Sequence, residues 1–178
     1  MTDQALIEGC IRENKRCQKE LFLRYAGKML TVCRRYARHQ LEAEDILQDA
    51  FIKVFDKIDQ FKYNGSFEGW IRRIVVNTAL KNYKKSSFQK EQIGIEDYEE
   101  GALEPSVYAQ LHEEELLNLI AELPDGYRLV FNLYVIEGFS HKEIAETLNI
   151  QEATSRSQLL KARKMLQAQI LNSQKISA

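Results

Sequence analysis

The amino-acid sequence predicts an all-α protein of two small helical domains joined by a flexible acidic linker. Apolar residues recur at three- and four-residue steps along most of the 178 residues, which is the spacing of amphipathic helices. The chain has only 8 Gly and 2 Pro, too few for a fold built of hairpins and tight turns. Periodicity is lost only in one polar stretch, residues 86–106, which we predict to be the linker.

The first predicted domain covers residues 1–85 and contains four helices. A short helix precedes a long amphipathic one over about 15–38, where apolar residues keep helical spacing. The segment LEAEDILQDAFIKVFDKI begins acidic and ends with lysines, the order that the helix dipole favours. After the loop FKYNG, Ser66 is placed to cap a helix that runs to about residue 85.

The second predicted domain covers residues 107–178. A helix runs from about 107 to 123 and ends at Pro124, and Asp125 is expected to cap the next helix, which ends at Gly138. Ser140 and Glu143 have the spacing of a capping box at the start of the short helix HKEIAETL. That helix breaks at 149–150, and a final helix follows over about 151–171.

Charge is divided unevenly along the chain, although the formal net charge is only −1. Residues 1–90 carry a net +7, residues 91–122 a net −10 without a single Lys or Arg, and residues 123–178 a net +2. Two basic blocks flanking an acidic segment suggest a polyanionic partner for the blocks and a connecting role for the acidic part.

The sequence excludes several classes of protein. Its longest nearly apolar stretch, residues 129–136, is far shorter than the about 20 residues that cross a bilayer, so we expect no membrane insertion. The N-terminus lacks the basic start and apolar core of a signal peptide. Three cysteines without metal-ligand spacing indicate buried thiols in a reducing, cytoplasmic compartment: Cys10, Cys17 and Cys33.

No catalytic constellation is present in the sequence. The three histidines are scattered, with no zinc-binding HExxH spacing and no neighbouring nucleophile motif: His39, His112 and His141. Walker and GxGxxG loops are also absent. We therefore expect a protein that is not an enzyme and that needs neither a metal nor a cofactor.

The last two helices have the plan of a helix-turn-helix motif, whose second helix lies in the DNA major groove. Apolar and small residues are expected to face inward on both helices, and Ser155 shares that inward face on the second. The outer face would then carry side chains able to bond bases and phosphates: Thr154, Ser157, Gln158, Lys161 and Lys164. A helical hairpin with a solvated basic face is the alternative.

In the first domain, the segment FKYNGSFEGWIRRIVVNTALKNYKK interleaves aromatic residues with cations around a polar turn. This combination suits single-stranded nucleic acid, because bases stack on rings while phosphates meet charges. The alternative is that Phe67, Trp70 and Ile74 are simply core. We expect Trp70 and Ile74 to be core, and the polar residues and lysines to make the contact.

Together these segments resemble a known family. AEDILQDAFIKVFDKIDQF, followed by FEGWIRRIVVNTALKNYKK, is similar to the second conserved region of bacterial RNA polymerase sigma factors. LPDGYRLVFNLYVIEGFSHKEIAETLNIQEATSRSQLLKARKML is similar to their fourth region. The short length, with no third region, resembles the extracytoplasmic-function (ECF) group of the sigma-70 family. The resemblance covers about residues 10–85 and 110–170.

The resemblance implies three sets of contact residues. One set would dock on the clamp helices of the largest polymerase subunit: Asp45, Ile46, Gln48, Asp49, Phe51 and Ile52. A second would melt the −10 element and capture a flipped base of the single-stranded non-template strand: Phe61, Lys62, Asn64, Ser66, Phe67, Arg73, Asn77, Lys81 and Lys84. A third would read the double-stranded −35 element: Thr154, Arg156, Ser157, Gln158, Lys161, Arg163 and Lys164.

The sequence departs from the family pattern at one position. The family often has Gly-Thr-Val before the recognition helix, where this chain has Ala153-Thr154-Ser155. Because Ser155 is polar at a position that is usually apolar, the rotation of that helix is left open by the sequence.

The resemblance implies a sigma factor that binds core RNA polymerase, including the flap of the second-largest subunit, and directs promoter-specific initiation. An inhibitory anti-sigma factor is a usual partner in the group. Two rival functions remain open at this stage: a stand-alone helix-turn-helix repressor, and a helical adaptor with no DNA role.

Overall fold

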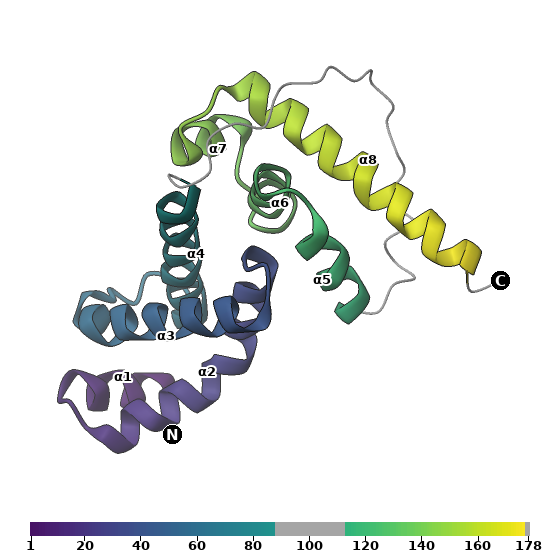
Figure 1. Cartoon of the computed structure of the whole chain (residues 1–178). Helices are drawn as coiled ribbons and strands as arrows, with labels where there is room; N and C mark the ends of the chain where they lie inside the picture. Colours follow the sequence, from purple (N-terminus) through teal and green to yellow (C-terminus); the bar gives the residue numbers. More distant parts are fainter. Residues whose placement is uncertain (88–112, 177–178) are drawn as a thin grey trace. The chain divides into compact units, whose positions relative to one another are not determined.

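A computed structural model describes residues 1–87 and 113–176 and divides the chain into two compact units, Met1–Gln92 and Ile93–Ala178 (Figure 1). Every regular element in the described residues is helical, which confirms the predicted fold class. The predicted linker, 86–106, and the first part of the predicted helix over 107–123 lie almost wholly outside the described residues.

The first unit is a bundle built around three long helices. α1 (Asp3–Ile11), α2 (Lys15–Tyr36) and α3 (Gln40–Lys57) are followed by a single 3-10 turn, η1 (Ile58–Gln60), and then by α4 (Phe67–Ser87). α2, α3 and α4 pack pairwise against one another, and α1 packs on α2. The core is formed by their apolar stripes, which include Leu21, Met29, Ile46, Val54 and Ile71.

Side-chain caps fix where the helices of the first unit begin. Asn14 Oδ1 accepts hydrogen bonds from the backbone N–H groups of Arg16 (3.0 Å) and Cys17 (3.2 Å) at the start of α2. His39 Nδ1 accepts from the N–H of Glu42 (3.2 Å) at the start of α3. The predicted cap at Ser66 is confirmed, since its Oγ accepts from the N–H of Gly69 at 3.0 Å. Each cap satisfies a donor that the helix itself leaves unpaired.

In its described residues, 113–176, the second unit has four α-helices and one π-helical turn. The order is α5 (Glu113–Glu122), α6 (Asp125–Phe131), the π-helical η3 (Asn132–Ile136), α7 (His141–Leu148) and α8 (Glu152–Ile176). α8 packs against α6, α7 and α5. Its buried stripe, which includes Leu159, Ala162, Leu166 and Ile170, forms one wall of this unit's core.

The connection between α5 and α6 differs from the prediction. Pro124, not Asp125, occupies the N-cap position of α6 and makes no side-chain cap. Asp125 is the first helical residue instead, and its Oδ1 accepts a hydrogen bond from Nη2 of Arg128 at 2.8 Å. Arg128 is only 3% exposed, and its Nη1 also donates to the carbonyl of Leu123 at 3.1 Å. The Asp125 carboxylate therefore pairs with a buried cation three residues later on the same helix.

The three cysteines are free and buried, as the sequence predicted. Burial raises the pKa of the Cys10 thiol to about 11 and that of Cys33 to about 12. Because the thiolate is the reactive form, these two side chains are poor nucleophiles and poor metal ligands near neutral pH.

Within the described residues, no helix is both long and apolar enough to span a bilayer.

Candidate polymerase and nucleic-acid interfaces

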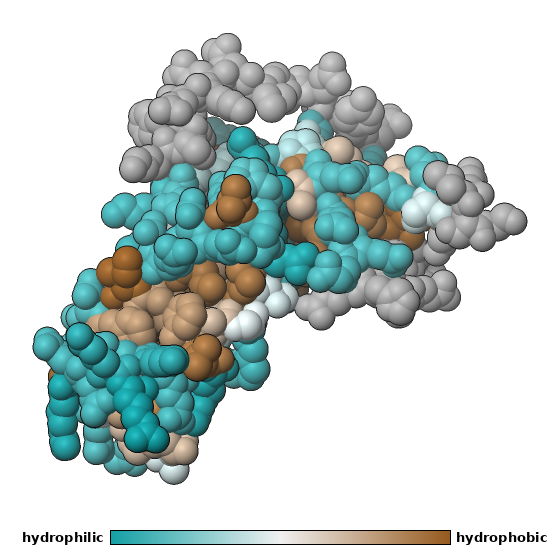
Figure 2. Space-filling model, turned by 60° about the horizontal axis from the view of Figure 1, so that its bottom comes forward, coloured by the Kyte–Doolittle hydropathy of each residue, from teal (hydrophilic) through white to brown (hydrophobic). Residues whose placement is uncertain are grey.

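One face of α3 presents two carboxylates, an amide and an isoleucine to solvent. Asp45 lies three and four residues before Gln48 and Asp49, and Ile52 lies four and three residues after them, so all four share one side of the helix. All four are exposed, and Ile52 has 59% of its surface accessible. Ile52 is one of several large apolar side chains that the first unit exposes, and apolar patches interrupt its polar surface (Figure 2). We call these four residues the α3 face.

Two of the residues predicted to contact the polymerase point the other way. Ile46 and Phe51 are each only 2% exposed and belong to the core of the first unit. The Phe51 ring packs edge-on against Phe22, with ring centroids 4.8 Å apart. Of the two apolar candidates for this contact, Phe51 and Ile52, Ile52 is the exposed one, while Ile46 and Phe51 pack in the core of the first unit.

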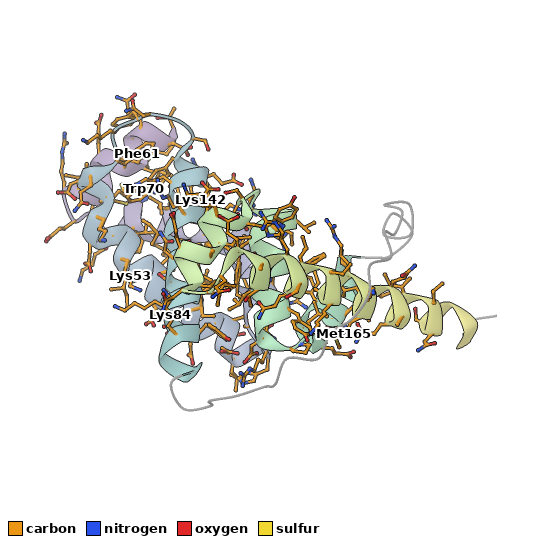
Figure 3. All side chains as sticks on the ribbon, turned by 90° about the horizontal axis from the view of Figure 1, so that it is seen from above. Lys53, Phe61, Trp70, Lys84, Lys142 and Met165 are labelled. Atoms are coloured by element: carbon orange, nitrogen blue, oxygen red, sulfur yellow. The ribbon has the colours of Figure 1, made fainter. Side chains whose placement is uncertain are left out.

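The loop between η1 and α4 is built around an aromatic cluster. The Phe61 ring lies 5.0 Å from Tyr63, 5.1 Å from Phe67 and 5.6 Å from Trp70, centroid to centroid. Figure 3 shows Phe61 beside Trp70 at this end of α4. Phe61 and Phe67 are 8% and 5% exposed, so the prediction that their rings contact nucleic acid is not supported by the free chain. They position the loop, whereas Lys62, Asn64 and Ser66 are exposed along it.

Tyr63 is a loop residue that the predicted site left out. Its side chain is 54% exposed, and its backbone adopts a left-handed conformation with φ of +55°. Such a φ is uncommon for a bulky residue, and Gly65, two residues later, also has a positive φ of +102°. The sequence signal was the alternation of aromatic and polar residues, which does not show which ring faces outward.

A polar stripe continues from this loop along α4. Arg73, Asn77, Lys81 and Lys84 recur at steps of three or four residues and are all exposed, so the structure brings these predicted residues onto one helix face. Trp70 and Ile74 are half-buried rather than full core. The stripe combines cations with an amide that can bond a base edge.

In the second unit, α7 and α8 form the predicted helix-turn-helix motif. Ser140 Oγ accepts from the N–H of Glu143 at 3.2 Å, and Glu143 Oε2 accepts from the N–H of Ser140 at 2.8 Å, which confirms the capping box. The backbone N–H and the hydroxyl of Ser140, which both donate to Glu143 Oε2 at 2.8 Å, lower the pKa of the Glu143 carboxyl. Asn149 ends α7 in the left-handed conformation with φ of +57°, which turns the chain tightly into α8.

The exposed face of α8 is rotated about the helix axis relative to the predicted outer face. Arg156, Ser157 and Arg163 are exposed. Gln158 instead lies against α6. Its Nε2 is so close to Gly126 that a Cβ atom added there would be 3.0 Å away. Three further predicted residues lie at the edge of the exposed face and are half-buried: Thr154, Lys161 and Lys164.

Contacts with other residues restrain several of these side chains. Arg156 Nη2 is paired with Glu152 at 2.9 Å, and Ser157 Oγ donates to the carbonyl of Thr154 at 3.0 Å. Arg163 lies over the ring of Tyr134, with its guanidinium carbon 6.0 Å from the centroid. The exposed face of α8 is basic, and its arginine side chains are held by contacts with neighbouring residues.

Comparison with known proteins identifies the family to which this chain belongs. Residues 21–89 match the family model for sigma-70 region 2, and residues 113–166 match that for sigma-70 region 4. The chain is 31% identical over 183 residues to the ECF RNA polymerase sigma-E factor of Haemophilus influenzae, with 96% of each protein covered. This chain belongs to the ECF sigma factors of the sigma-70 family. It directs the initiation of transcription, acting with core RNA polymerase on promoter DNA, and its family is not a class of enzymes.

A second relative and one solved structure are also similar to this chain. The sigma factor is 28% identical over 179 residues to the ECF RNA polymerase sigma-E factor of Escherichia coli K12, with 93% of each covered. It also shares its fold with the sigma factor RpoE of Bartonella quintana, solved in complex with the anti-sigma factor NepR. The TM-score is 0.51 and the identity 22%, over 86% of this chain and 96% of that one.

Proposed function

We propose that the α3 face docks this sigma factor on the clamp helices of the largest polymerase subunit. The observation that carries the proposal is the exposure of Asp45, Gln48, Asp49 and Ile52 on one side of a helix whose other side is core. Acidic side chains around an exposed apolar residue suit a basic partner helix that also has an apolar spot. None of the ion pairs found among the described residues involves Asp45 or Asp49.

The loop at Tyr63 and the polar stripe of α4 are proposed to open the −10 element and hold its non-template strand. Flipping a base out of the duplex costs a few kcal/mol. Stacking on an exposed aromatic ring returns about 1–3 kcal/mol for each base. Tyr63 supplies such a ring, while Arg73, Lys81 and Lys84 supply cations for the phosphates. Asn64, Ser66 and Asn77 supply polar groups for base edges.

The helix-turn-helix unit is proposed to read the −35 element with α8 in the major groove. Arg156, Ser157 and Arg163 are the exposed candidates on this helix, flanked by Thr154 and Lys161. Gln158 is the weakest of the predicted base contacts, since it packs toward Gly126.

The domain boundaries complete the proposal. Residues 1–85 form the polymerase-binding and −10 domain, residues 107–178 form the −35 domain, and 86–106 connects them. Two weak DNA-binding units on one chain gain affinity when the polymerase holds both at the correct separation. An inhibitory anti-sigma protein is a further proposed partner, in analogy to the complex of the Bartonella quintana protein, and the cytoplasm is the proposed compartment.

Co-purification followed by run-off transcription tests this function. We expect the sigma factor to associate with core polymerase and to produce transcripts with a defined start site on a promoter template. A helix-turn-helix repressor would bind DNA but would not co-purify with core polymerase. A helical adaptor would leave initiation unchanged on every template, and either result would refute the proposal.

Replacing Lys161 by Ala is expected to weaken binding to the upstream element. Loss of one phosphate contact reduces the steepness of the dependence of log Kd on log salt concentration by about 1. Binding of the holoenzyme to upstream duplex DNA, measured over a series of salt concentrations, gives this slope. Lys19→Ala, on exposed α2 surface outside the proposed interfaces, is the matched control. Equal slopes for the two variants would remove Lys161 from the DNA contact.

A further inference from the structure

A polar bridge joins the two helices of the DNA-binding motif at the position where the sequence departs from the family pattern. Ser155 lies near the start of α8 and is 0% exposed. Its Oγ is 2.9 Å from Nδ1 of His141, the first residue of α7. The polar residue in the buried stripe of α8 therefore has a specific side-chain partner on the neighbouring helix.

The bridge explains how a hydroxyl is tolerated in this stripe. The neighbouring buried positions of α8 are apolar, namely Leu159, Ala162 and Leu166. A buried hydroxyl without a hydrogen-bond partner is costly, whereas a paired one is not. Rotation of α8 about its axis would separate Ser155 from His141, so the bond favours one rotation of the recognition helix.

The imidazole is itself held by a third element. The Tyr134 ring in the π-helical turn η3 stacks on the ring of His141, with centroids 4.5 Å apart and planes 20° from parallel. A π-helical turn shifts the side chains that follow it relative to an α-helix, and such turns are often found at functional positions. Arg163, farther along α8, lies over the same tyrosine ring. One imidazole thus contacts both α8 and η3.

We propose that His141 is a positioning residue that sets the rotation of α8 and so decides which α8 side chains face promoter DNA. The proposal rests on the proposed function of α8 in reading the upstream element. His141 acts through Ser155 and Tyr134 and need not touch DNA itself.

Burial and two nearby arginines favour the neutral form of the His141 imidazole. Burial lowers the pKa of His141 below its ordinary value of 6.5, and Arg156 and Arg163 lower it further, while Glu152 raises it. Lys142 and Glu143 are its charged neighbours on α7, and Tyr134 is the titratable group of η3 against it. A neutral imidazole can exchange a hydrogen bond with a hydroxyl in either tautomer.

Three variants separate the hydrogen bond from simple packing. His141→Asn keeps a polar atom close to the position of Nδ1 and should preserve the bridge. His141→Leu keeps bulk but leaves the Ser155 hydroxyl unpaired. The double change His141→Leu with Ser155→Ala removes both polar groups, so it should recover stability that the single leucine change loses, although it still lacks the bridge.

The measurement is selection by the reconstituted holoenzyme from promoter templates with a randomised upstream element. We expect the wild type and His141→Asn to enrich the same upstream sequence. His141→Leu should reduce that enrichment about tenfold, equivalent to about 1.4 kcal/mol. The double variant should regain melting temperature but remain below the wild type in enrichment, because it has no bridge to set the rotation of α8; full recovery of the enrichment would overturn the positioning role. Circular dichroism at the assay temperature checks that each variant is folded.

A pH profile of thermal stability provides a second measurement. Because the folded-state pKa of His141 is below 6.5, the unfolded chain binds the proton more readily. The neutral His141 side chain therefore contributes its full stabilisation above pH 6.5. That stabilisation is lost as the pH falls from 6.5 through the lower pKa of the folded state. When the pH is lowered from about 7.5 to about 5.5, the melting temperature of the wild type should decrease more than that of His141→Asn.

The outcomes distinguish this inference from the proposed function. If the wild type selects a promoter while His141→Leu selects it equally well, or while His141→Asn is as impaired as His141→Leu, the positioning role is wrong and the proposed function stands. Equal pH profiles of the wild type and His141→Asn would also overturn it. If the wild type supports no promoter-dependent initiation, both the function and the inference fall.

Discussion

Reversing the charges of Asp45 and Asp49 to lysine is expected to abolish association with core RNA polymerase. Both carboxylates are exposed on the α3 face beside Ile52, and lysines there would oppose a basic partner. Close charge pairs across protein interfaces have coupling energies of about 1.5–7 kcal/mol. The double variant should therefore bind core polymerase at least about 100-fold more weakly, as measured by fluorescence anisotropy or co-purification.

A matched control carries the same change of charge elsewhere on the first unit. Glu8 and Glu13 are exposed on α1 and in the turn after it, outside the α3 face. The double change of these two residues to lysine should leave polymerase affinity within about threefold of the wild type, since isolated surface charges contribute little. Ile52→Glu should weaken binding without altering the fold. If the Asp45 and Asp49 variant bound as tightly as its control, the polymerase would dock elsewhere.

Truncating Phe61 to alanine is expected to cause the largest loss of stability among the loop substitutions. Its ring contacts Tyr63, Phe67 and Trp70 and is almost fully buried. Removal of a buried phenylalanine ring costs about 3–5 kcal/mol, a large part of the stability of a small domain. Urea unfolding followed by Trp70 fluorescence should show a much lower midpoint, and initiation should be lost with the loop geometry.

Tyr63→Ala separates the function of the loop from its stability. The ring is 54% exposed, so its loss should shift the urea midpoint far less than the loss of Phe61. Removal of one stacking platform, worth about 1–3 kcal/mol, should still reduce open-complex formation about tenfold on linear promoter DNA. A template with a pre-melted −10 region should restore much of that loss. Full activity of the variant on duplex DNA would show that another group captures the displaced base.

The helices could be predicted because each signal that marks them is local. Apolar spacing placed α2 over about 15–38, where the structure has Lys15–Tyr36. The Ser140 and Glu143 pair placed the start of α7, because a capping box needs only residues three apart. The cap predicted at Asp125 is one position too late in the turn. Pro124 takes the N-cap position, and the Asp125 carboxylate pairs with Arg128 three residues later on the same helix, so two local signals competed for one side chain.

The orientation of individual side chains could not be predicted in the same way. The loop sequence showed that aromatic residues gather there, but the exposure of the Tyr63 ring, on a left-handed backbone, and the burial of Phe61 and Phe67 depend on how the folded loop packs. Ser155 likewise left the rotation of α8 open. That rotation depends on His141 and Tyr134, which lie 14 and 21 positions earlier in the chain and meet only after folding.

The most direct test of the account is selection by the holoenzyme from templates in which two promoter segments are randomised together. If both units of the chain recognise promoter DNA, the sigma factor should enrich two separate motifs at a fixed spacing, one at the −35 element and one at the −10 element. Core polymerase alone should enrich neither. Recovery of a single motif, or of two motifs at variable spacing, would contradict the claim that both units act on the same promoter.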